Sequence, residues 1–319
     1  MNNAEFNSKI VEKMNEYVGG GYEISLAKVR KNNGIILDGM TVRKNGKNTA
    51  PTLYLNSLYE DYKDGASFGE VFEHLRSFYD KHDGSDPDDS ISSIDANIFE
   101  SFDNIRTRIL YKLINAEKNE KLLEDIPHII WNDLAIVFFY SYPRRSIGGA
   151  TVLIKNEYIS NWNVTIEDLI KCSTENMPKA APAQLIPLTR MIAQLMGDAD
   201  SFGEHDVTDE DISNADISNA DTSTPMYVLS NRDRMFGAAA MIYSNRISLL
   251  AEKLEHNIYV IPSSIHEVIL VPDMGNSDPD YLRDTIKEVN ETQVEPEEVR
   301  SEQLYYYDRT EKKISVLCA

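Results

Sequence analysis

The strands predicted from the sequence come in pairs joined by short turns, and this limits the chain to folds built on antiparallel sheets. The clearest pair flanks Asn33-Gly34, the preferred dipeptide of a tight type I′ turn, with an alternating segment at 22–26 before it and a second segment at 35–43 after it. Two more pairs of this kind are expected, at 133–142 with 149–154 and at 303–307 with 312–317. Because helical segments lie between hairpins rather than within long crossovers, the pattern predicts an α+β fold. We expect mixed, mainly antiparallel sheets with covering helices, in two or three packed units.

Residues 1–81 are predicted to form an N-terminal α+β unit. Apolar residues recur at helical spacing from Phe6 to Tyr17, and three glycines at 19–21 end that helix. A third strand at 51–55 and a second amphipathic helix at 68–78 complete the unit. The polar stretch 82–95 that follows is rich in Asp and Ser, which is typical of a loop, and it is a candidate boundary.

Residues 96–196 are predicted to form a middle helix–hairpin–helix unit, which can pack with the first unit as one domain. A long amphipathic helix is expected from an apolar spacing of three or four residues, carried by Phe102, Ile105, Ile109, Leu113 and Ala116. Thr165 with Asp168 three residues later is a capping box, which predicts a helix reaching residue 176. After three prolines, one more helix face is expected at 188–195.

Residues 197–225 are predicted to be an acidic, low-complexity linker. Nine acidic residues and no basic residue lie between Arg190 and Arg232, and the pentad Asp-Ile-Ser-Asn-Ala occurs twice in tandem at 211–220. Two or three pentads are too few to complete a coil of a β-helix, because a solenoid needs several stacked units to bury its core. A polar segment of this kind does not bury enough apolar surface to offset the entropy of ordering it.

Residues 226–319 are predicted to form a C-terminal α+β unit. Strands are expected at 226–230, 257–261 and 265–271, with a mostly helical stretch at 237–254. The segment 265–271 is apolar on both faces, which predicts a place in the middle of a sheet. Ser277 is expected to cap a further helix, with Pro279 in its first turn.

Composition excludes several classes of protein. The net charge of −20 argues against a nucleic-acid binder, since phosphate neutralisation needs basic residues, although a DNA-mimicking inhibitor stays open as a variant. No apolar run is long enough to cross a membrane and no signal peptide is recognisable, so we expect a cytoplasmic protein with no membrane partner. Neither of the two cysteines belongs to a CxxC pair and no phosphate-binding loop is found, so neither a metal nor a cofactor is predicted.

Several short sequence segments along the chain resemble segments of a known family. They are Lys31-Asn32-Asn33-Gly34, Ala50-Pro51-Thr52-Leu53-Tyr54-Leu55, Tyr111-Lys112-Leu113-Ile114-Asn115, Asp133-Leu134-Ala135-Ile136-Val137, Met226-Tyr227-Val228-Leu229, Phe236-Gly237-Ala238-Ala239 and the stretch 261–268. The chain resembles the uncharacterised clostridial family catalogued as domain of unknown function 5688, nearly throughout except at 82–95 and in the acidic linker. The resemblance implies an anaerobic bacterial cytoplasm and supports 197–225 as an insertion. It implies no activity, cofactor or catalytic residue.

One group of side chains could carry chemistry. Ser263, Ser264, His266 and Glu267 lie at the turn into the predicted central strand, where functional residues often lie. Along a regular strand Ser264 and His266 share a face at about 6.6 Å, so a serine nucleophile needs the loop to curl. The structural alternative is a polar edge that satisfies backbone groups beside Pro262, with His266 as an ordinary, partly buried imidazole.

Two further clusters are candidate binding residues. Asn231 and Arg232 follow the first strand of the C-terminal unit, where the alternative is a helix start with Asn231 as its cap. Arg144 and Arg145 lie at a hairpin tip and could clamp a carboxylate or phosphate, or could simply be a basic, soluble tip.

Two functions follow as hypotheses. The first is an accessory or protein-interaction module without catalytic activity, whose partner is another protein and whose oligomeric state is open. The alternative is a small hydrolase or transferase with His266 as general base and Ser263 or Ser264 as nucleophile or positioning hydroxyl.

Overall fold

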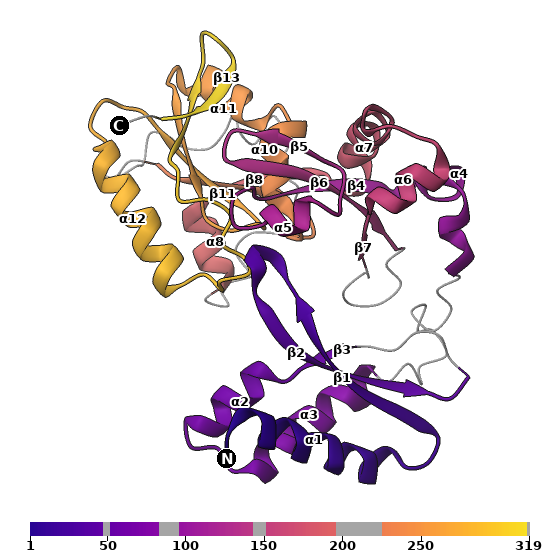
Figure 1. Cartoon of the computed structure of the whole chain (residues 1–319). Helices are drawn as coiled ribbons and strands as arrows, with labels where there is room; N and C mark the ends of the chain where they lie inside the picture. Colours follow the sequence, from indigo (N-terminus) through magenta and orange to yellow (C-terminus); the bar gives the residue numbers. More distant parts are fainter. Residues whose placement is uncertain (47–51, 83–95, 143–150, 196–224, 318–319) are drawn as a thin grey trace. The chain divides into compact units, whose positions relative to one another are not determined.

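A computed structural model of the chain describes residues 1–46, 52–82, 96–142, 151–195 and 225–317 (Figure 1). The fold is α+β, with three sheets in which all the paired strands are antiparallel. The chain divides into two compact units. The first unit comprises Met1–Ile98 with Tyr142–Ala150, and the second comprises Phe99–Ser141 with Thr151–Ala319.

The first unit is a three-stranded sheet with three helices. Its elements are α1 (Asn3–Val18), β1 (Tyr22–Arg30), β2 (Ile36–Lys44), β3 (Thr52–Tyr54), α2 (Asn56–Lys63) and α3 (Phe68–His82). Asn2 caps α1 in a capping box, and Gly19 at φ 73° ends it, as the glycine run predicts. Asn33 and Gly34 both have positive φ, and the Ile35 N–H donates to the Asn32 carbonyl, so the predicted turn is confirmed.

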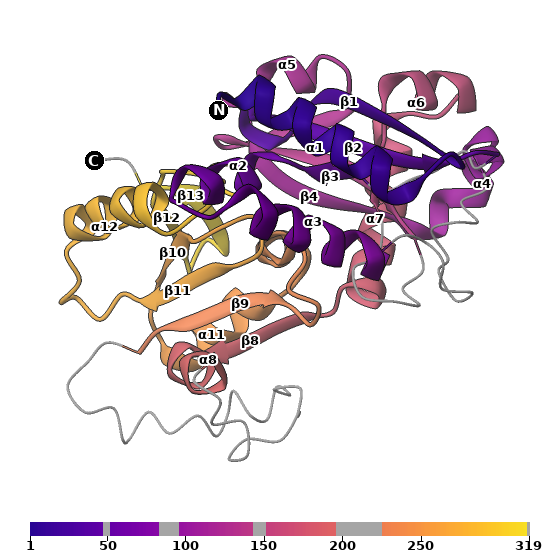
Figure 2. The same ribbon diagram turned by 90° about the horizontal axis from the view of Figure 1, so that it is seen from below.

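The core of the first unit lies between its helices and one face of its sheet (Figure 2). Phe6 and Ile10 of α1 are fully buried, and they pack with Met40 of β2 and Val71 of α3. The predicted helical spacing of α1 is therefore the spacing of its buried face.

The first sheet of the second unit is centred on β6 (Leu134–Ser141). β6 pairs with β4 (Ile109–Asn115), β5 (His128–Trp131) and β7 (Thr151–Leu153). The predicted hairpin between 133–142 and 149–154 is confirmed by the β6–β7 pair, whereas the tip with Arg144 and Arg145 lies outside the described residues. Strand β5 was not predicted.

The long helix predicted through residues 102–116 is wrong. Helix α4 covers only Phe102–Ile105, and Ile109–Asn115 is strand β4, in which six of the seven residues are buried. A segment that is apolar on nearly every position fits a helical spacing as well as a strand, and pairing with β6 decides the outcome.

Further helices belong to this part of the second unit. They are α5 (Glu120–Leu123), α6 (Asn156–Trp162) and α7 (Ile166–Ala180). Thr165 caps α7 in the predicted capping box with Asp168, and Asn163 ends α6 at positive φ. The Asn176 amide of α7 donates to the Arg106 and Ile109 carbonyls, at 2.7 and 3.0 Å, and so holds α7 against the start of β4.

The second sheet of this unit has six strands in the order β13-β12-β10-β11-β9-β8. The strands are β8 (Ala183–Pro187), β9 (Tyr227–Asn231), β10 (Ile258–Pro262), β11 (Val268–Pro272), β12 (Tyr305–Asp308) and β13 (Lys313–Val316). The predicted central place of the 265–271 strand is confirmed, since β11 lies between β10 and β9, but the strand begins at Val268. Residues 263–267 are therefore a loop.

The sequence does not predict strand β8, because Pro182 and Pro187, two of the three prolines before residue 188, interrupt the pattern. It is an edge strand, where a missing N–H is tolerated, and it pairs with β9 on the far side of the predicted linker. Residues of the predicted middle and C-terminal units thus share one sheet. Of the linker, all but residue 225 lies outside the described residues.

Helices pack against this sheet. They are α8 (Leu188–Leu195), α10 (Ala240–Tyr243), α11 (Arg246–Leu254) and α12 (Pro279–Thr292). Ile286 of α12 packs in a cluster with Tyr259, Val271 and Leu304. Asp278, not Ser277, caps α12, and Pro279 occupies its first position as expected.

Candidate functional site

The loop at 263–267 is held by bonds to its own backbone and to the segment after α12. The Ser264 hydroxyl accepts from the His266 N–H at 3.0 Å, and the Ser264 N–H donates to the Glu267 carbonyl at 3.4 Å. The Ile265 N–H donates to the Glu298 carbonyl at 3.1 Å. The loop is curled, and the Ser264 hydroxyl is engaged with the backbone.

Both ring nitrogens of His266 have partners. Nδ1 accepts from the Phe236 N–H at 3.3 Å, and Nε2 lies 3.3 Å from Glu298 Oε1. A ring nitrogen that accepts a hydrogen bond carries no proton, so the bond from Phe236 places the ring proton on Nε2, which faces the Glu298 carboxylate. The ring also stacks on Phe236, with centroids 5.9 Å apart and planes 11° apart. In this arrangement neither nitrogen is left to take a proton from a serine.

Residue 237 must be glycine for the loop to pack as it does. A Cβ built on Gly237 would lie 2.2 Å from Ser230 Oγ and 2.5 Å from the His266 carbonyl oxygen. The Ser230 hydroxyl donates to that same carbonyl at 2.7 Å. The close backbone approach therefore seats Phe236, at a φ of 54°, beside the His266 ring.

The Phe236 ring has two further contacts, both from the four-stranded sheet. Lys112 Nζ of β4 lies 4.3 Å from the ring centroid, in a cation–π contact, and Phe139 of β6 meets the ring edge-on at 5.3 Å. The predicted site loop is thus joined through Phe236 to the other sheet of the second unit.

The structure places Asn231 and Arg232 in different surroundings, one buried and one exposed. Asn231 is 2 % exposed, and its amide accepts from the Met235 N–H at 3.2 Å and donates to the Met235 carbonyl at 2.8 Å. It is the last residue of β9, so the alternative interpretation as a helix cap is wrong; its side chain closes the turn that leads to Phe236. The Arg232 side chain is exposed, and its N–H donates to the Pro182 carbonyl at 3.1 Å.

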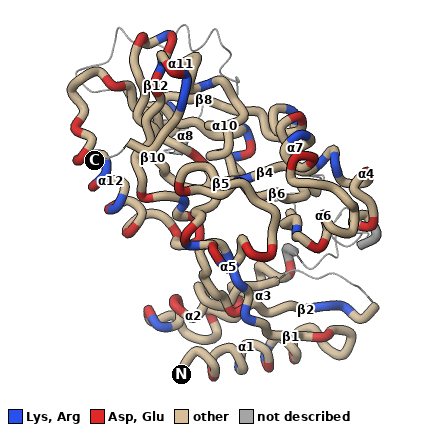
Figure 3. The backbone as a smooth tube through the Cα atoms, turned by 45° about the horizontal axis from the view of Figure 1, so that its top comes forward, with Lys and Arg blue, Asp and Glu red and all other residues tan. Residues whose placement is uncertain are grey.

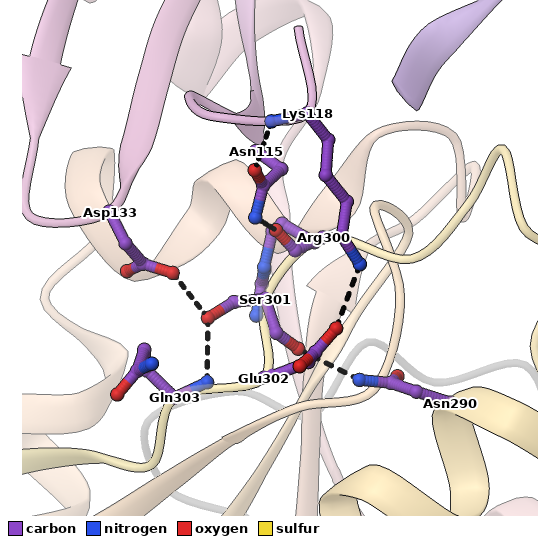
Figure 4. Close-up of polar contacts among 8 residues, drawn as sticks. All are labelled: Asn115, Lys118, Asp133, Asn290, Arg300, Ser301, Glu302 and Gln303. Atoms are coloured by element: carbon purple, nitrogen blue, oxygen red, sulfur yellow. Dashed lines mark hydrogen bonds and ion pairs between the residues drawn. The ribbon is translucent and has the colours of Figure 1, made fainter. Parts of the chain in front are cut away.

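A second polar cluster, which we name the Arg300 cluster, lies where the segment after α12 meets the end of β4 and the turn before β6 (Figure 4). Asn115 donates to the Arg300 carbonyl at 3.1 Å. Asp133 accepts from the Ser301 hydroxyl at 2.6 Å and from the Tyr305 hydroxyl at 2.5 Å. On the outer side, Lys118 pairs with Glu302 at 2.8 Å, and Asn290 donates to the Ser301 carbonyl at 2.9 Å.

Arg300 is 1 % exposed, and within the described part of the chain none of its three guanidinium nitrogens has a hydrogen-bond partner. Burial lowers its pKa to about 10, while the neighbouring Tyr305 and Asp133 act in the opposite direction. Sequence reasoning missed this residue. In the sequence, the burial of Arg300 is indicated only by its position between the apolar residues Val299 and Leu304. Surface segments show the same pattern.

Other chemistry is limited in the described residues. No group of three or more His, Cys, Asp or Glu side chains there is arranged to hold a metal ion. Cys172 is a free thiol, and burial raises its pKa to about 11, which disfavours a reactive thiolate. A search of the same residues for a helix long and apolar enough to span a membrane finds none.

Comparisons with known proteins give one match. No protein of curated function and no solved structure matches the chain. Residues 3–309 match the model of a family described as a family of unknown function, DUF5688. This match spans both units, including the His266 loop and the Arg300 cluster, and it agrees with the resemblance carried by the sequence phrases. The chain therefore belongs to the DUF5688 family of unknown function.

Proposed function

We propose that this protein is a non-catalytic protein-interaction module of the bacterial cytoplasm. The observation that carries the proposal is the engagement of His266, whose Nδ1 accepts from the Phe236 N–H and whose Nε2 lies 3.3 Å from the Glu298 carboxylate. A general base needs a nitrogen free to accept the substrate's or nucleophile's proton. Ser264 and His266 are therefore better suited to hold the 263–267 loop against Phe236 and Glu298 than to act on a substrate.

The outer surface of α12 supports an interaction role. Asp280, Asp284, Glu288 and Glu291 recur at spacings of four, four and three residues along the helix, and all four are exposed. Figure 3 marks acidic positions in red along α12. Tyr281 directly follows Asp280, and 69 % of its surface is exposed. An exposed aromatic side chain beside charged residues is a composition found at protein interfaces, and the charge favours a partner with a basic surface. We name these four acidic residues and Tyr281 the α12 surface.

Capture from a lysate of the native bacterium tests the proposal. Three full-length chains are compared. They are the wild type, an α12 variant that carries both Asp284→Lys and Glu288→Lys, and a control variant that carries both Glu12→Lys and Glu16→Lys on α1. The two variants have the same charge change and the same spacing. We expect the wild type and the control to retain one stoichiometric protein partner. The α12 variant, or the wild type in high salt, should retain about tenfold less.

Two outcomes contradict the proposal. One is equal capture by all three chains, or by none of them at low salt. The other is hydrolysis or group transfer by the purified wild type that His266→Gln abolishes without changing the thermal midpoint. The second outcome would establish the hydrolase or transferase alternative.

A further inference from the structure

Strand β1 is a long edge strand whose outer side pairs with no other strand among the described residues. It lies at one end of the order β1-β2-β3 and pairs with β2 along its whole length, without a bulge or a proline. Six of its nine residues are exposed, and Leu26 at its midpoint is 45 % exposed. The backbone N–H and C=O groups that point away from β2 are therefore open to a further strand.

The other edge strands in the described part of the chain are shorter or covered. Strands β3, β5, β7, β8 and β13 have three to five residues each, and six of the seven residues of β4 are buried. Native proteins keep edge strands short, bulged or interrupted by proline, because a regular edge is a template for pairing with another chain. Strand β1 has none of these three devices, and strand addition is a recurring mode of protein recognition.

The charges on β1 do not prevent such pairing. Charged side chains are a further means of keeping edge strands apart, and β1 carries Glu23, Lys28 and Arg30. Glu23 forms an ion pair with Arg43 of β2, and Lys28 forms one with Asp38 of the same strand. Two of the three charges are therefore compensated within the sheet, and the third lies at the end of the strand.

We propose that β1 pairs antiparallel with β1 of a second copy of this chain, with Leu26 opposite Leu26 of the partner subunit at a twofold axis. Two antiparallel copies of a nine-residue strand pair over all nine residues only in the register that joins their midpoints, and Leu26 is the midpoint of β1. The two three-stranded sheets then become one antiparallel sheet of six strands.

The side chains fit this register. It places the two exposed Leu26 side chains against each other. It also sets Ile24 opposite Lys28, and Tyr22 opposite Arg30. No two like charges are directly opposite, although such pairs would arise if the register moved so that Lys28 lay on the axis. This self-complementarity favours a second copy over an unrelated extended segment.

Sedimentation velocity over about 1–200 µM protein tests the pairing, because an interface of two strands is smaller than a standard one and is expected to be weak. The samples are the wild type, Leu26→Lys, Leu26→Glu, an equimolar mixture of these two variants, and Met274→Lys. Met274 is 46 % exposed in a loop of the second unit, so its replacement by lysine is a matched control. The pairing is independent of the α12 surface and of the function proposed above.

We expect the wild type and Met274→Lys to approach twice the mass of one chain at the highest concentration. Leu26→Lys and Leu26→Glu each place like charges at the axis, so each should associate at least about tenfold more weakly. Their mixture should regain association, because opposite charges then face each other. A wild type that stays monomeric overturns the proposal. Equal association of the wild type and the Leu26 variants, equal weakening by Met274→Lys, or no recovery in the mixture also overturns it.

Amide hydrogen exchange keeps the proposal testable if the Leu26 variants do not fold. In the wild type, protection of the amides of residues 22–30 should rise with protein concentration over the same range, whereas that of residues 52–54 in β3 should stay constant. Protection in β1 that does not depend on concentration overturns the proposal.

Discussion

Glu298 holds His266 from two directions. Its carboxylate Oε1 lies 3.3 Å from the His266 Nε2, and its carbonyl accepts from the N–H of the residue before His266, at 3.1 Å. Two residues further on, the same segment places the buried Arg300. The 263–267 loop and the Arg300 cluster are therefore attached to one stretch of chain, and a change in either is expected to be felt by the other.

The close packing at Gly237 gives a direct test of the loop. Gly237→Ala places a methyl group against Ser230 Oγ and the His266 carbonyl, and we expect a loss of about 2–3 kcal/mol in the free energy of unfolding. Gly20→Ala is the control, because a Cβ there meets no atom within 4 Å, and we expect a change within about 0.5 kcal/mol. Equal effects in urea denaturation would contradict the packing described.

Asp133→Asn tests the Arg300 cluster. In the wild type both carboxylate oxygens of Asp133 accept from hydroxyls. The asparagine amide keeps one of these acceptors, but its NH2 group faces the other hydroxyl as a second donor. The substitution also removes a negative charge near Arg300. We expect a loss of about 1–3 kcal/mol in the free energy of unfolding. The exposed Asp125→Asn should change it by less than about 0.5 kcal/mol. If both variants unfold at the wild-type denaturant concentration, the cluster does not stabilise the fold.

Stability is expected to fall above about pH 10. Burial raises the pKa values of Tyr111 and Tyr243, and that of Tyr306 to about 12, so these phenols stay protonated in the folded chain and ionise on unfolding. Stability that such groups contribute is present below the unfolded pKa of about 10 and is lost as the pH rises through the folded values. Arg300 has the opposite sign, since its folded pKa lies below its unfolded one.

The raised pKa values of several tyrosines lower the stability at high pH by more than the lowered pKa of the single Arg300 increases it. We therefore expect the urea midpoint to fall between about pH 10 and 12. Tyrosinate absorbance should rise in two steps, with the buried phenols ionising only on unfolding. Replacing Arg300 with Met should make the fall with pH steeper. A midpoint that stays constant over this range would contradict the burial of these phenols.

Much of the fold was predictable because its signals are local. The Asn33-Gly34 turn, the Thr165 capping box and the hairpins at both ends of the chain depend on neighbouring residues and were found from them. The apolar run Ile109–Asn115 fits the period of a helix as well as that of a strand, so the sequence predicts a helix there, and only pairing with the distant β6 makes it a strand. Strand β8 likewise depends on pairing with β9, whose residues lie 40 to 48 positions further along the chain.

The candidate site was predictable only in part. The 263–267 loop is predictable because its polar side chains adjoin a buried strand. The residues that contact His266 in this loop are not predictable from the sequence. Phe236 and Glu298 reach His266 from 30 and 32 positions away along the chain. Arg300 was missed because its burial comes from the end of β4 and the turn before β6, and nothing in its neighbours marks it as internal.

Deletion of residues 204–223 tests the predicted linker. The composition of this stretch does not favour burial, and β8 and β9 on either side of it are paired through five residues each. Shortening such a connection changes its closure entropy by only about 1 kcal/mol, so we expect the thermal midpoint to change by a few degrees at most. A fall of more than about 8 °C would show that the stretch contributes to the folded body.

The position of the His266 ring proton decides whether this histidine is engaged by the fold or available as a base. Long-range ¹H–¹⁵N spectra of the labelled chain, with the ring assigned by comparison with His266→Gln, distinguish a protonated ring nitrogen from an acceptor. We expect one tautomer, with the proton on Nε2 beside the Glu298 carboxylate and an unprotonated Nδ1 that accepts from the Phe236 N–H. A proton on Nδ1 with a free Nε2, or the averaged pattern of an unbound imidazole, would contradict it and return His266 to the role of an available base.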